Sequence, residues 1–333
     1  MLTQLRRRVL IGVIIGVLVM MALVLVADAG ALMRALRDFE WWLLPAVMAL
    51  TLLNYALRFV KWQFFLRVLG VTGLTRGDSA LIFVAAFTMV MTPGKVGEFL
   101  KSYLVKLRSG APMTKTAPII FAERFSDGVA MLVLAGVGLT AFRYGWQVLI
   151  AGAVVSVAAF VVIRRERWMQ AVLRTVGGTR IGKGRAESLE TLYRGTRSLL
   201  RPRPFGIAIG IGVVSWFGEC VALFLVLIGL GVPASWNLLL AATFVFAAAT
   251  WIGGVSMLPG GLGAADVSVA GLLLITVNDP AMTASLAATA TLLIRFATLW
   301  FGVLVGVLAM TRVAAWPGAV SSSDATTTMP SPS

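Results

Sequence analysis

The chain contains 333 residues, of which 59% are hydrophobic and 13% charged, and its formal net charge is +15. This apolar content is typical of polytopic membrane proteins and excludes a soluble enzyme of ordinary composition. With no His and a single cysteine, Cys220, the chain lacks the commonest metal ligand and proton shuttle and cannot form an internal disulfide. We therefore expect an all-α membrane protein with no metal site and no cofactor.

Residues 1–27 predict an uncleaved membrane anchor. Three consecutive arginines at 6–8 precede the apolar run at 9–26, which is long enough to cross a bilayer and longer than the core of most signal peptides. The arginines place the N-terminus in the cytoplasm. The segment at 28–40 has mixed charge, and we expect it on the outer side of the membrane.

A helix is predicted at 41–60, returning to the cytoplasm. Asn54, Arg58 and Lys61 follow one another at spacings of four and three, so they share one face near the inner end of this helix. We expect Lys61 to reach lipid phosphates at the cytoplasmic surface. Asn54 and Arg58 lie deeper, and two interpretations stay open: a structural or snorkelling role, or part of a polar pathway.

A first break follows, because the apolar run at 81–91 is interrupted by Pro-Gly-Lys-Val-Gly-Glu at 93–98 before an amphipathic run at 99–106. Hydrocarbon tolerates neither loose backbone nor unpaired charge, so this break should line a cavity. Basic residues beyond both ends place them in the cytoplasm, so the segment is expected to dip into the membrane and return. The candidate substrate-binding residues of this broken hairpin are Pro93, Gly94, Lys95, Gly97 and Glu98.

The next helix is predicted at 117–140 and completes a first unit at 41–140. It carries Glu123, Arg124 and Asp127 within one apolar stretch. Helical spacing places the three side chains close together, and we expect a partly neutralised cluster that faces protein or water. A structural ion pair and a role in substrate binding are both compatible with this pattern.

A connecting helix is predicted at 146–163, followed by a basic cytoplasmic segment at 164–204. The segment contains many arginines and few carboxylates, which places it in the cytoplasm. Residues 186–200 have a helical pattern of leucines, and we expect this helix to lie on the inner leaflet. Topology alone explains the positive charge, so nucleic-acid binding is not predicted.

A second unit is predicted at 205–312. Its first helix, 205–232, carries Glu219 near the middle of the membrane, where a carboxylate must be protonated, hydrogen-bonded or exposed to a cavity. The candidate substrate-binding residues of this unit are Glu219, Pro259, Gly260, Gly261, Gly263 and Arg295. The secondary candidates of the whole chain are Asn54, Arg58 and Asp266.

The second break is flanked by apolar runs at 238–257 and 264–277. Because the first of these runs is long enough to span a bilayer, both a re-entrant and a spanning path remain open. A last helix, which carries Arg295, is predicted at 283–310. Residues 313–333 are rich in Ser, Thr and Pro, and we expect a disordered tail.

The two units repeat the same order of features: a helix with a polar residue, a break that reads Pro-Gly-x-x-Gly, and a helix with an embedded arginine. The charge map makes the two units inverted, and inverted repeats with broken helices are typical of alternating-access transporters. A duplicated scaffold is the alternative. We expect about six spanning helices plus two broken, re-entrant hairpins.

The chemistry of the breaks favours an anionic substrate. Backbone N–H groups that are freed at the start of a half-helix attract phosphate or carboxylate. Lys95, Arg124 and Arg295 could add charge-assisted hydrogen bonds to a phosphate. The carboxylates at 98, 123 and 127 would hold these cations in place, or bind an amine or a coupling proton.

The chain resembles the transmembrane region of lysylphosphatidylglycerol synthases, a flippase-like family that includes stand-alone UPF0104 proteins, at three motifs: TPGKVGEFLKSY at 92–103, AERFSDG at 122–128 and LPGGLGAAD at 258–266. The resemblance covers about residues 7–312 and implies lipid translocation. Family members that are fused to glycosyltransferase domains imply polyprenyl-linked sugars as another cargo. We expect a stand-alone form without the soluble synthase domain, which argues against aminoacyl transfer. Asp266 stands where the family pattern has Arg or Glu close behind the last Gly, which makes it a secondary candidate.

We therefore expect a flippase, and not an enzyme, in the cytoplasmic (inner) membrane, with several spans and both termini in the cytoplasm. Its cargo would be an anionic or phosphate-bearing lipid, either an aminoacyl-phospholipid or a polyprenyl-phosphate-linked sugar. Two alternatives remain. One is a membrane-embedded lipid-modifying transferase with Glu98 or Asp127 as base. The other is a non-transporting scaffold that recruits a cytoplasmic synthase through residues 164–204.

Overall fold

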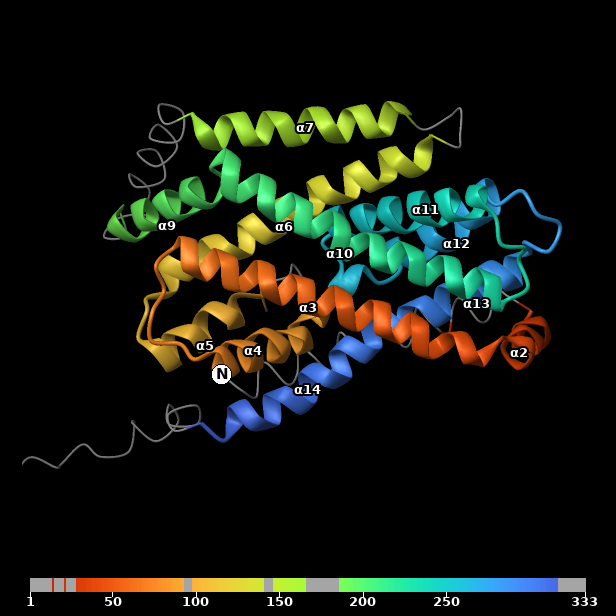
Figure 1. Cartoon of the computed structure of the whole chain (residues 1–333), viewed down its shortest axis with the longest axis horizontal. Coiled ribbons are helices and arrows are strands. Elements are labelled where there is room, and N and C mark those ends of the chain that lie inside the picture. Colours follow the sequence, from red (N-terminus) through yellow and green to blue (C-terminus); the bar gives the residue numbers. More distant parts are fainter. Residues whose placement is uncertain are drawn as a thin grey trace, which may run out of the picture.

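The computed structural model describes residues 28–92, 98–140, 146–165 and 186–316, together with the isolated positions 14 and 21. Within these ranges every regular element is a helix (Figure 1). Five of the described helical stretches are long and apolar enough to cross a membrane: Trp41–Val68, Pro202–Gly229, Trp236–Val255, Pro259–Thr276 and Ala284–Ala314. The prediction of an all-α polytopic membrane protein is therefore confirmed. The predicted anchor at 1–27, the break at 93–97 and the tail from 317 lie outside the described residues.

The first half of the chain contains α2 (Ala29–Asp38), η1 (Trp41–Leu43), α3 (Leu44–Val68), α4 (Arg76–Ala85), η2 (Ala86–Met91), α5 (Leu100–Ser109) and α6 (Met113–Leu139). The connecting elements are α7 (Trp146–Arg164) and α9 (Ala186–Leu199). The second half contains α10 (Pro202–Gly229), α11 (Trp236–Val255), η4 (Pro259–Gly261), α12 (Ala264–Thr276), α13 (Ala284–Arg295), the π-helical turn η5 (Phe296–Trp300) and α14 (Phe301–Ala314).

Two element ends differ from the sequence prediction in ways that matter below. The helix predicted at 41–60 continues to Val68, so Lys61 lies inside α3 and not at its end. The last helix continues to Ala314, and Val313 is buried on it, so the start of the predicted tail at 313 was placed too early. In both cases an apolar face that packs on neighbouring helices extends the helix past the last long apolar run.

Helices α3 and α10 lie side by side in the middle of the molecule and run in opposite directions (Figure 1). At one end the amide of Glu40 donates to the carbonyl of Gly229 over 2.9 Å. Further along, the side-chain amide of Asn54 donates to the carbonyl of Ser215 over 2.9 Å. Low residue numbers on one helix therefore meet high numbers on the other. The first helices of the two predicted units are antiparallel.

Each broken hairpin packs against the last helix of the other unit. Elements α4 and η2 lie on α14, and α11 lies on α6. Both contacts use a glycine, because a Cβ atom at Gly306 would lie 2.7 Å from the amide nitrogen of Thr88, and one at Gly138 would lie 2.5 Å from that of Phe244. The absence of a side chain lets the two backbones approach this closely. The same type of contact is thus made twice, with the units exchanged.

The second hairpin turns inside the molecule. Along α6, α11 contacts Gly138 through Phe244 and Gly128 through Trp251, and Gly128 lies near the middle of α6. Pro259 and Gly261 in the turn are buried, and Gly260 adopts a φ of 60°. The element η4 also touches η2, so the second break meets the element that leads into the first. Although α11 is long enough to span a membrane, its last turn lies beside the middle of α6, with Gly253 buried and Val255 exposed.

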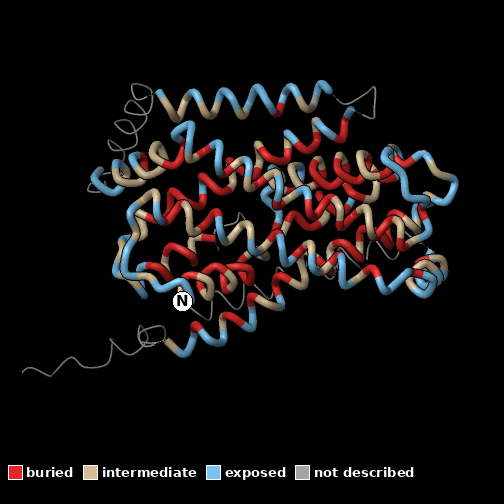
Figure 2. Tube along the Cα trace, viewed as in Figure 1, coloured by how far each residue is buried: buried red, intermediate tan, exposed pale blue. Residues whose placement is uncertain are grey.

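The core follows α3, α6, α10 and α11, whereas α7 is exposed along most of its length (Figure 2). Helix α9 packs across α6, and Gly195 lies so close to Pro118 that a Cβ atom there would be 2.7 Å from the proline ring. Tyr193 and Leu199 of α9 are buried. The apolar face of α9, which was predicted to lie on the inner leaflet, therefore packs largely against protein.

Candidate functional site

A cavity of about 190 Å³ lies between the two halves of the chain. Its wall is built from α3, η2, α6, α10, α11, η4, α12, α13, η5 and α14, so both halves contribute. The charged residues in this wall are Arg58, Glu98, Arg124, Glu219 and Arg295. The cavity therefore brings together three guanidinium groups and two carboxylates in an otherwise apolar interior.

Arg58 enters the cavity from α3 without a carboxylate partner among the described residues. Its guanidinium carbon lies 5.2 Å from the centre of the Trp216 ring and 6.0 Å from that of Phe87. Cation–π contacts of this kind stabilise a guanidinium in a site of low polarity and leave its N–H groups available. Of the two interpretations of Arg58, the structure favours a polar lining residue.

The same ion pair occurs once in each half. The carboxylate that follows the first break, Glu98, accepts a hydrogen bond from Nε of Arg124 over 2.8 Å. The carboxylate that follows the second break, Asp266, pairs with Nε of Arg295. In both pairs the arginine comes from the helix that follows its hairpin and also lines the cavity. Each break is thereby tied to the third helix of its own unit.

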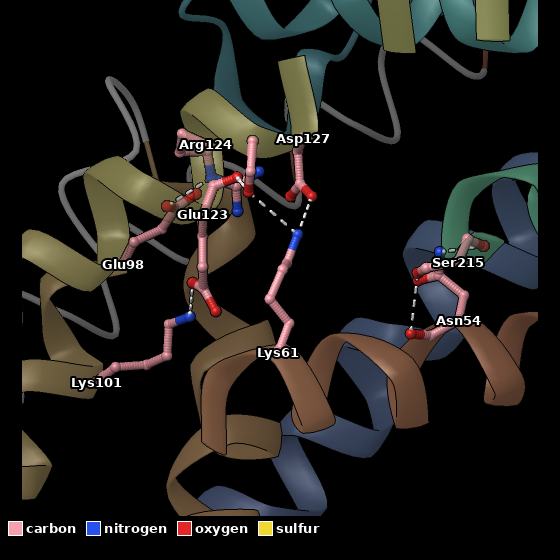
Figure 3. A network of polar contacts seen from close by, with 9 residues as sticks. Asn54, Lys61, Glu98, Lys101, Glu123, Arg124, Asp127 and Ser215 are labelled. Atoms are coloured by element: carbon pink, nitrogen blue, oxygen red, sulfur yellow. Dashed lines mark hydrogen bonds and ion pairs between the residues drawn. The ribbon is translucent and has the colours of Figure 1, made fainter. Parts of the chain in front are cut away.

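Three charged residues in the middle of α6 form ion pairs with residues outside the helix (Figure 3). Glu123 pairs with Lys101 of α5, Arg124 with Glu98, and Asp127 with Lys61 of α3. Each of these three charges therefore has an ion-pair partner outside the helix. The prediction for Lys61 was wrong: its side chain is 1% exposed, because Asp127 offers a buried partner that makes the path to the lipid surface unnecessary.

Glu219 is the exception among the buried carboxylates of the described chain. It is 2% exposed, and the hydroxyl of Thr51 donates a hydrogen bond to it over 3.2 Å. No described cation forms an ion pair with it, whereas each of the other four buried carboxylates has one. Glu219 also faces the cavity. Of the three alternatives predicted for a carboxylate at this depth, Glu219 therefore meets two: it is hydrogen-bonded and it is exposed to a cavity.

Two donors at the cavity wall lack an acceptor. The indole nitrogen of Trp216 and the Nη2 nitrogen of Arg295 are buried and have no hydrogen-bond partner among the described residues. A buried donor without an acceptor costs roughly 1–3 kcal/mol. Together with Arg58, these groups form a set of donors that an anionic ligand in the cavity would satisfy.

Arg295 directly precedes the π-helical turn η5. The hydroxyl of Tyr55 on α3 donates to the carbonyl of Thr298 in this turn over 2.6 Å. The ring fits against Gly302, where a Cβ atom would lie 2.5 Å from the hydroxyl oxygen. Single π-helical turns are frequent at functional sites because they redirect side chains and free backbone carbonyls. Here the turn places Arg295 at the cavity.

The structure places the predicted site residues in three groups. The first group lines the cavity: Asn54, Arg58, Glu98, Arg124, Glu219, Gly260, Gly261 and Arg295. The second supports it from outside and consists of Glu123, Asp127, Pro259, Gly263 and Asp266. The third lies outside the described residues: Pro93, Gly94, Lys95 and Gly97. Asn54 also joins α3 to α10, through the hydrogen bond from its side-chain amide to the carbonyl of Ser215. In the described parts of the chain, no group of three His, Cys, Asp or Glu side chains is arranged to hold a metal ion.

Sequence reasoning missed several cavity residues and a supporting one. Among them, Tyr55, Phe87 and Trp216 line the cavity, and Thr51 donates a hydrogen bond to Glu219. Thr51, Tyr55 and Arg58 are separated by four and three residues, so their shared face with Asn54 was a usable signal. Aromatic residues in apolar helices are common, and Phe87 and Trp216 gave no comparable signal.

Comparison with known proteins places the chain in a family. A model of the lysylphosphatidylglycerol synthase TM region matches residues 9–306. Two UPF0104 membrane proteins of Methanothermobacter thermautotrophicus are similar: one is 25% identical over 78% of this chain and 81% of its own length, the other 24% identical over 90% and 93%. The glycosyltransferase AglD of Haloferax volcanii is 26% identical over 138 residues, which are 41% of this chain and 22% of that protein. The chain belongs to the lysylphosphatidylglycerol synthase TM region family.

Proposed function

We propose that this protein moves a phosphate-bearing lipid between the two leaflets of a membrane, and that the phosphate of the head group binds in the central cavity. The observation that carries the proposal is the set of unsatisfied donors in the wall: Arg58, which has no described ionic partner, Nη2 of Arg295 and the indole of Trp216. Guanidinium groups bind phosphate through parallel hydrogen bonds. The acyl or prenyl chains would remain in the surrounding lipid.

The arrangement of the helices supports a transport role. The first helices of the two units are antiparallel, and each hairpin packs on the last helix of the other unit. The cavity is lined by Val90 and Glu98, which flank the first break, and by glycines of the second break. Inverted units with broken helices at a central site are the usual plan of alternating-access transporters. In this plan the two units rock about the site and open it to one side at a time.

We propose two classes of cargo. The family name concerns lysylphosphatidylglycerol, an aminoacyl-phospholipid, and supports the first class. The second class is polyprenyl-phosphate-linked sugars, and the partial match to a glycosyltransferase is compatible with a glycosylated cargo. Both carry a phosphate next to a long apolar chain, which is the chemistry that the cavity would recognise. We place the protein in the cytoplasmic membrane with both termini inside, from the distribution of its basic residues.

A lipid-modifying transferase is the second candidate, and the match to a glycosyltransferase favours it. The bases suggested for it, Glu98 and Asp127, are each held by a cation, which weakens a carboxylate as a general base. A product of changed mass after incubation with lipid would support this function. The scaffold alternative remains a proposal, and deletion of residues 168–183 tests it without removing α9, which packs on α6.

The deciding experiment is a leaflet-accessibility assay in liposomes that contain the purified protein. Labelled phosphatidylglycerol, lysylphosphatidylglycerol and a polyprenyl phosphate are compared side by side. Arg58→Ala is the sharpest variant, because its removal leaves no described carboxylate unpaired. A hydrogen bond to a charged group contributes about 1.5–3 kcal/mol, so transport at low lipid density should fall about 10- to 100-fold.

The matched control is Arg194→Ala, which removes a guanidinium that is 77% exposed on α9. It should transport like the unaltered protein. Arg124→Ala and Lys95→Ala should also abolish transport without preventing membrane insertion. Unchanged transport by Arg58→Ala would remove this residue from the binding site, and movement of none of the three lipids by folded protein would overturn the proposed function.

A further inference from the structure

We propose that Glu219 carries a proton with each anionic lipid, so that the protein is a proton–lipid symporter; this inference rests on the function proposed above. It assigns the coupling-ion site to a residue that neither the family match nor the relatives' names identify. The buried carboxylates differ in the partners that bind them.

Four buried carboxylates are locked by ion pairs. Glu98, Glu123, Asp127 and Asp266 are each bound to a lysine or arginine, which balances the charge of the carboxylate. Glu219 is as deeply buried, but its only hydrogen-bond partner among the described residues is the hydroxyl of Thr51. A hydroxyl can donate to a carboxylate or accept from a carboxylic acid. The site therefore accommodates both protonation states, as a proton carrier requires.

The charged and titratable groups that face Glu219 come from several elements. Helix α3 contributes Tyr55 and Arg58 beside Thr51, and the other cavity-lining charges are Glu98, Arg124 and Arg295. Cys220 follows Glu219 on α10 and is buried. Helix α11 contributes no charge to the cavity wall: its lining residues are Phe246, Thr250, Gly253 and Gly254. The pair of Lys61 and Asp127 meets α10 at Gly212, about two turns away.

Substrate and proton would bind cooperatively in this cavity. When the cavity is empty, the positive charge of Arg58 is available to balance an ionised Glu219, because Arg58 forms no ion pair with another described carboxylate. A phosphate that binds Arg58 removes this compensation and adds a like charge to the same cavity. Like charges at short range in a site of low polarity favour protonation of one of them. Binding of the anion therefore draws a proton from solution to the Glu219 carboxylate, and departure of the anion on the other side releases it.

The coupling has a defined charge balance. A lipid with one negative charge and one proton move together as a neutral unit. A difference of one pH unit across the membrane should then hold the lipid at about a tenfold higher level in the leaflet that faces the alkaline side. A membrane potential without a pH difference should have no effect on this ratio.

The test is the same leaflet assay with phosphatidylglycerol as probe, run without a gradient, with a gradient of one pH unit, and with a potassium–valinomycin potential alone. The unaltered protein should give the tenfold ratio only under the pH gradient, with the lipid on the alkaline side. Glu219→Gln should lower that ratio to one. The matched control Glu190→Gln, on the exposed face of α9, should keep it at ten.

The outcomes separate this inference from the proposed function. Movement of the lipid that ignores the pH gradient, or accumulation on the acidic side, overturns the symport and leaves the flippase intact. Absence of movement in every condition overturns both. If Glu219→Gln does not fold, the response of the unaltered protein decides. A second readout is infrared difference spectroscopy on addition of glycerol 3-phosphate: a new protonated carboxyl band is expected in the unaltered protein, and its absence contradicts the proposal.

Discussion

The two broken hairpins follow the same plan but are stabilised differently. The arms of the first, α4 and α5, have 10 residues each, or about 15 Å of helix, which is half the thickness of the hydrocarbon core. In the second, α11 has 20 residues and α12 has 13. The arms of the second hairpin pack closely on each other, because Gly253 lies against Gly261 and Ala265, and one ion pair, between Asp266 and Arg295, joins it to α13. The first hairpin is joined to α6 by two ion pairs, which Glu98 and Lys101 form.

This difference makes the first hairpin the better candidate for movement. Ion pairs can be exchanged for contacts with water or substrate, whereas closely packed backbones separate only at the cost of large cavities. The two matching arginines differ in the same sense, since the side chain of Arg124 is 36% exposed and that of Arg295 is 15% exposed. We infer that the first hairpin opens toward one side while the second remains part of the rigid frame.

The largest effect is expected for Asp266→Ala. Asp266 is fully buried, pairs with Arg295 and also accepts a hydrogen bond from the amide of Gly263 over 2.8 Å at the start of α12. Breaking a buried pair by removing one partner costs about 3–5 kcal/mol. Glu98→Ala, the matching change in the first hairpin, should cost only about 1–2 kcal/mol, because Arg124 can turn toward water.

Thermal unfolding of both variants in detergent measures this difference. Asp266→Asn is the informative control, because its side-chain oxygen can still accept from Gly263 while the charge is lost. It should fall between the unaltered protein and Asp266→Ala. Equal losses for Asp266→Ala and Glu98→Ala would mean that the two hairpins are anchored alike.

A second pair of variants tests what the two hairpins share. Gly138→Ala and Gly306→Ala place a methyl group against the backbone of α11 and η2, respectively. Overpacking of this kind costs about 1–3 kcal/mol, and we expect similar losses of thermal stability at both positions. Gly210→Ala is the control, since nothing lies within 4 Å of its added Cβ atom, and it should gain up to about 1 kcal/mol. A neutral Gly306→Ala would show that η2 is not packed on α14 as described.

The order of the helices could be read from the sequence because apolar run length and basic loops report directly on spanning segments. Arg124, Arg295 and Glu219 were found for the same reason, since charge is rare in hydrocarbon. The partner of Lys61 could not be found in this way. Asp127 lies on another helix, and whether a lysine snorkels or pairs depends on which helices touch.

The residues of the cavity wall could not be predicted for the same reason, because they depend on how neighbouring helices are aligned. The register between α3 and α10 determines that Thr51 meets Glu219, and side-chain periodicity within one helix says nothing about its neighbour's register. The π-helical turn after Arg295 carries no Pro or Gly within it, so it had no signature in the sequence. Contacts between elements, not the elements themselves, decide which charges face the substrate.

The smallest effect is expected at the surface end of the first hairpin, where Asp78 of α4 pairs with Arg108 of α5 over 2.9 Å. The hydrogen bond from Arg108 lowers the pKa of the Asp78 carboxyl below its usual value. A lowered folded-state pKa means that the unfolded chain binds the proton more readily, so the contribution to stability is complete above the unfolded pKa and disappears as the pH falls through the folded one. Because Arg108 is 45% exposed, Asp78→Asn should cost less than about 1 kcal/mol at neutral pH. The two proteins should converge in thermal stability under strong acid. Among the described residues, no ion pair joins the two arms of the second hairpin to each other, since Asp266 pairs with Arg295 of α13. A difference between the two proteins that grows on acidification would contradict this assignment of pH sensitivity to the first hairpin.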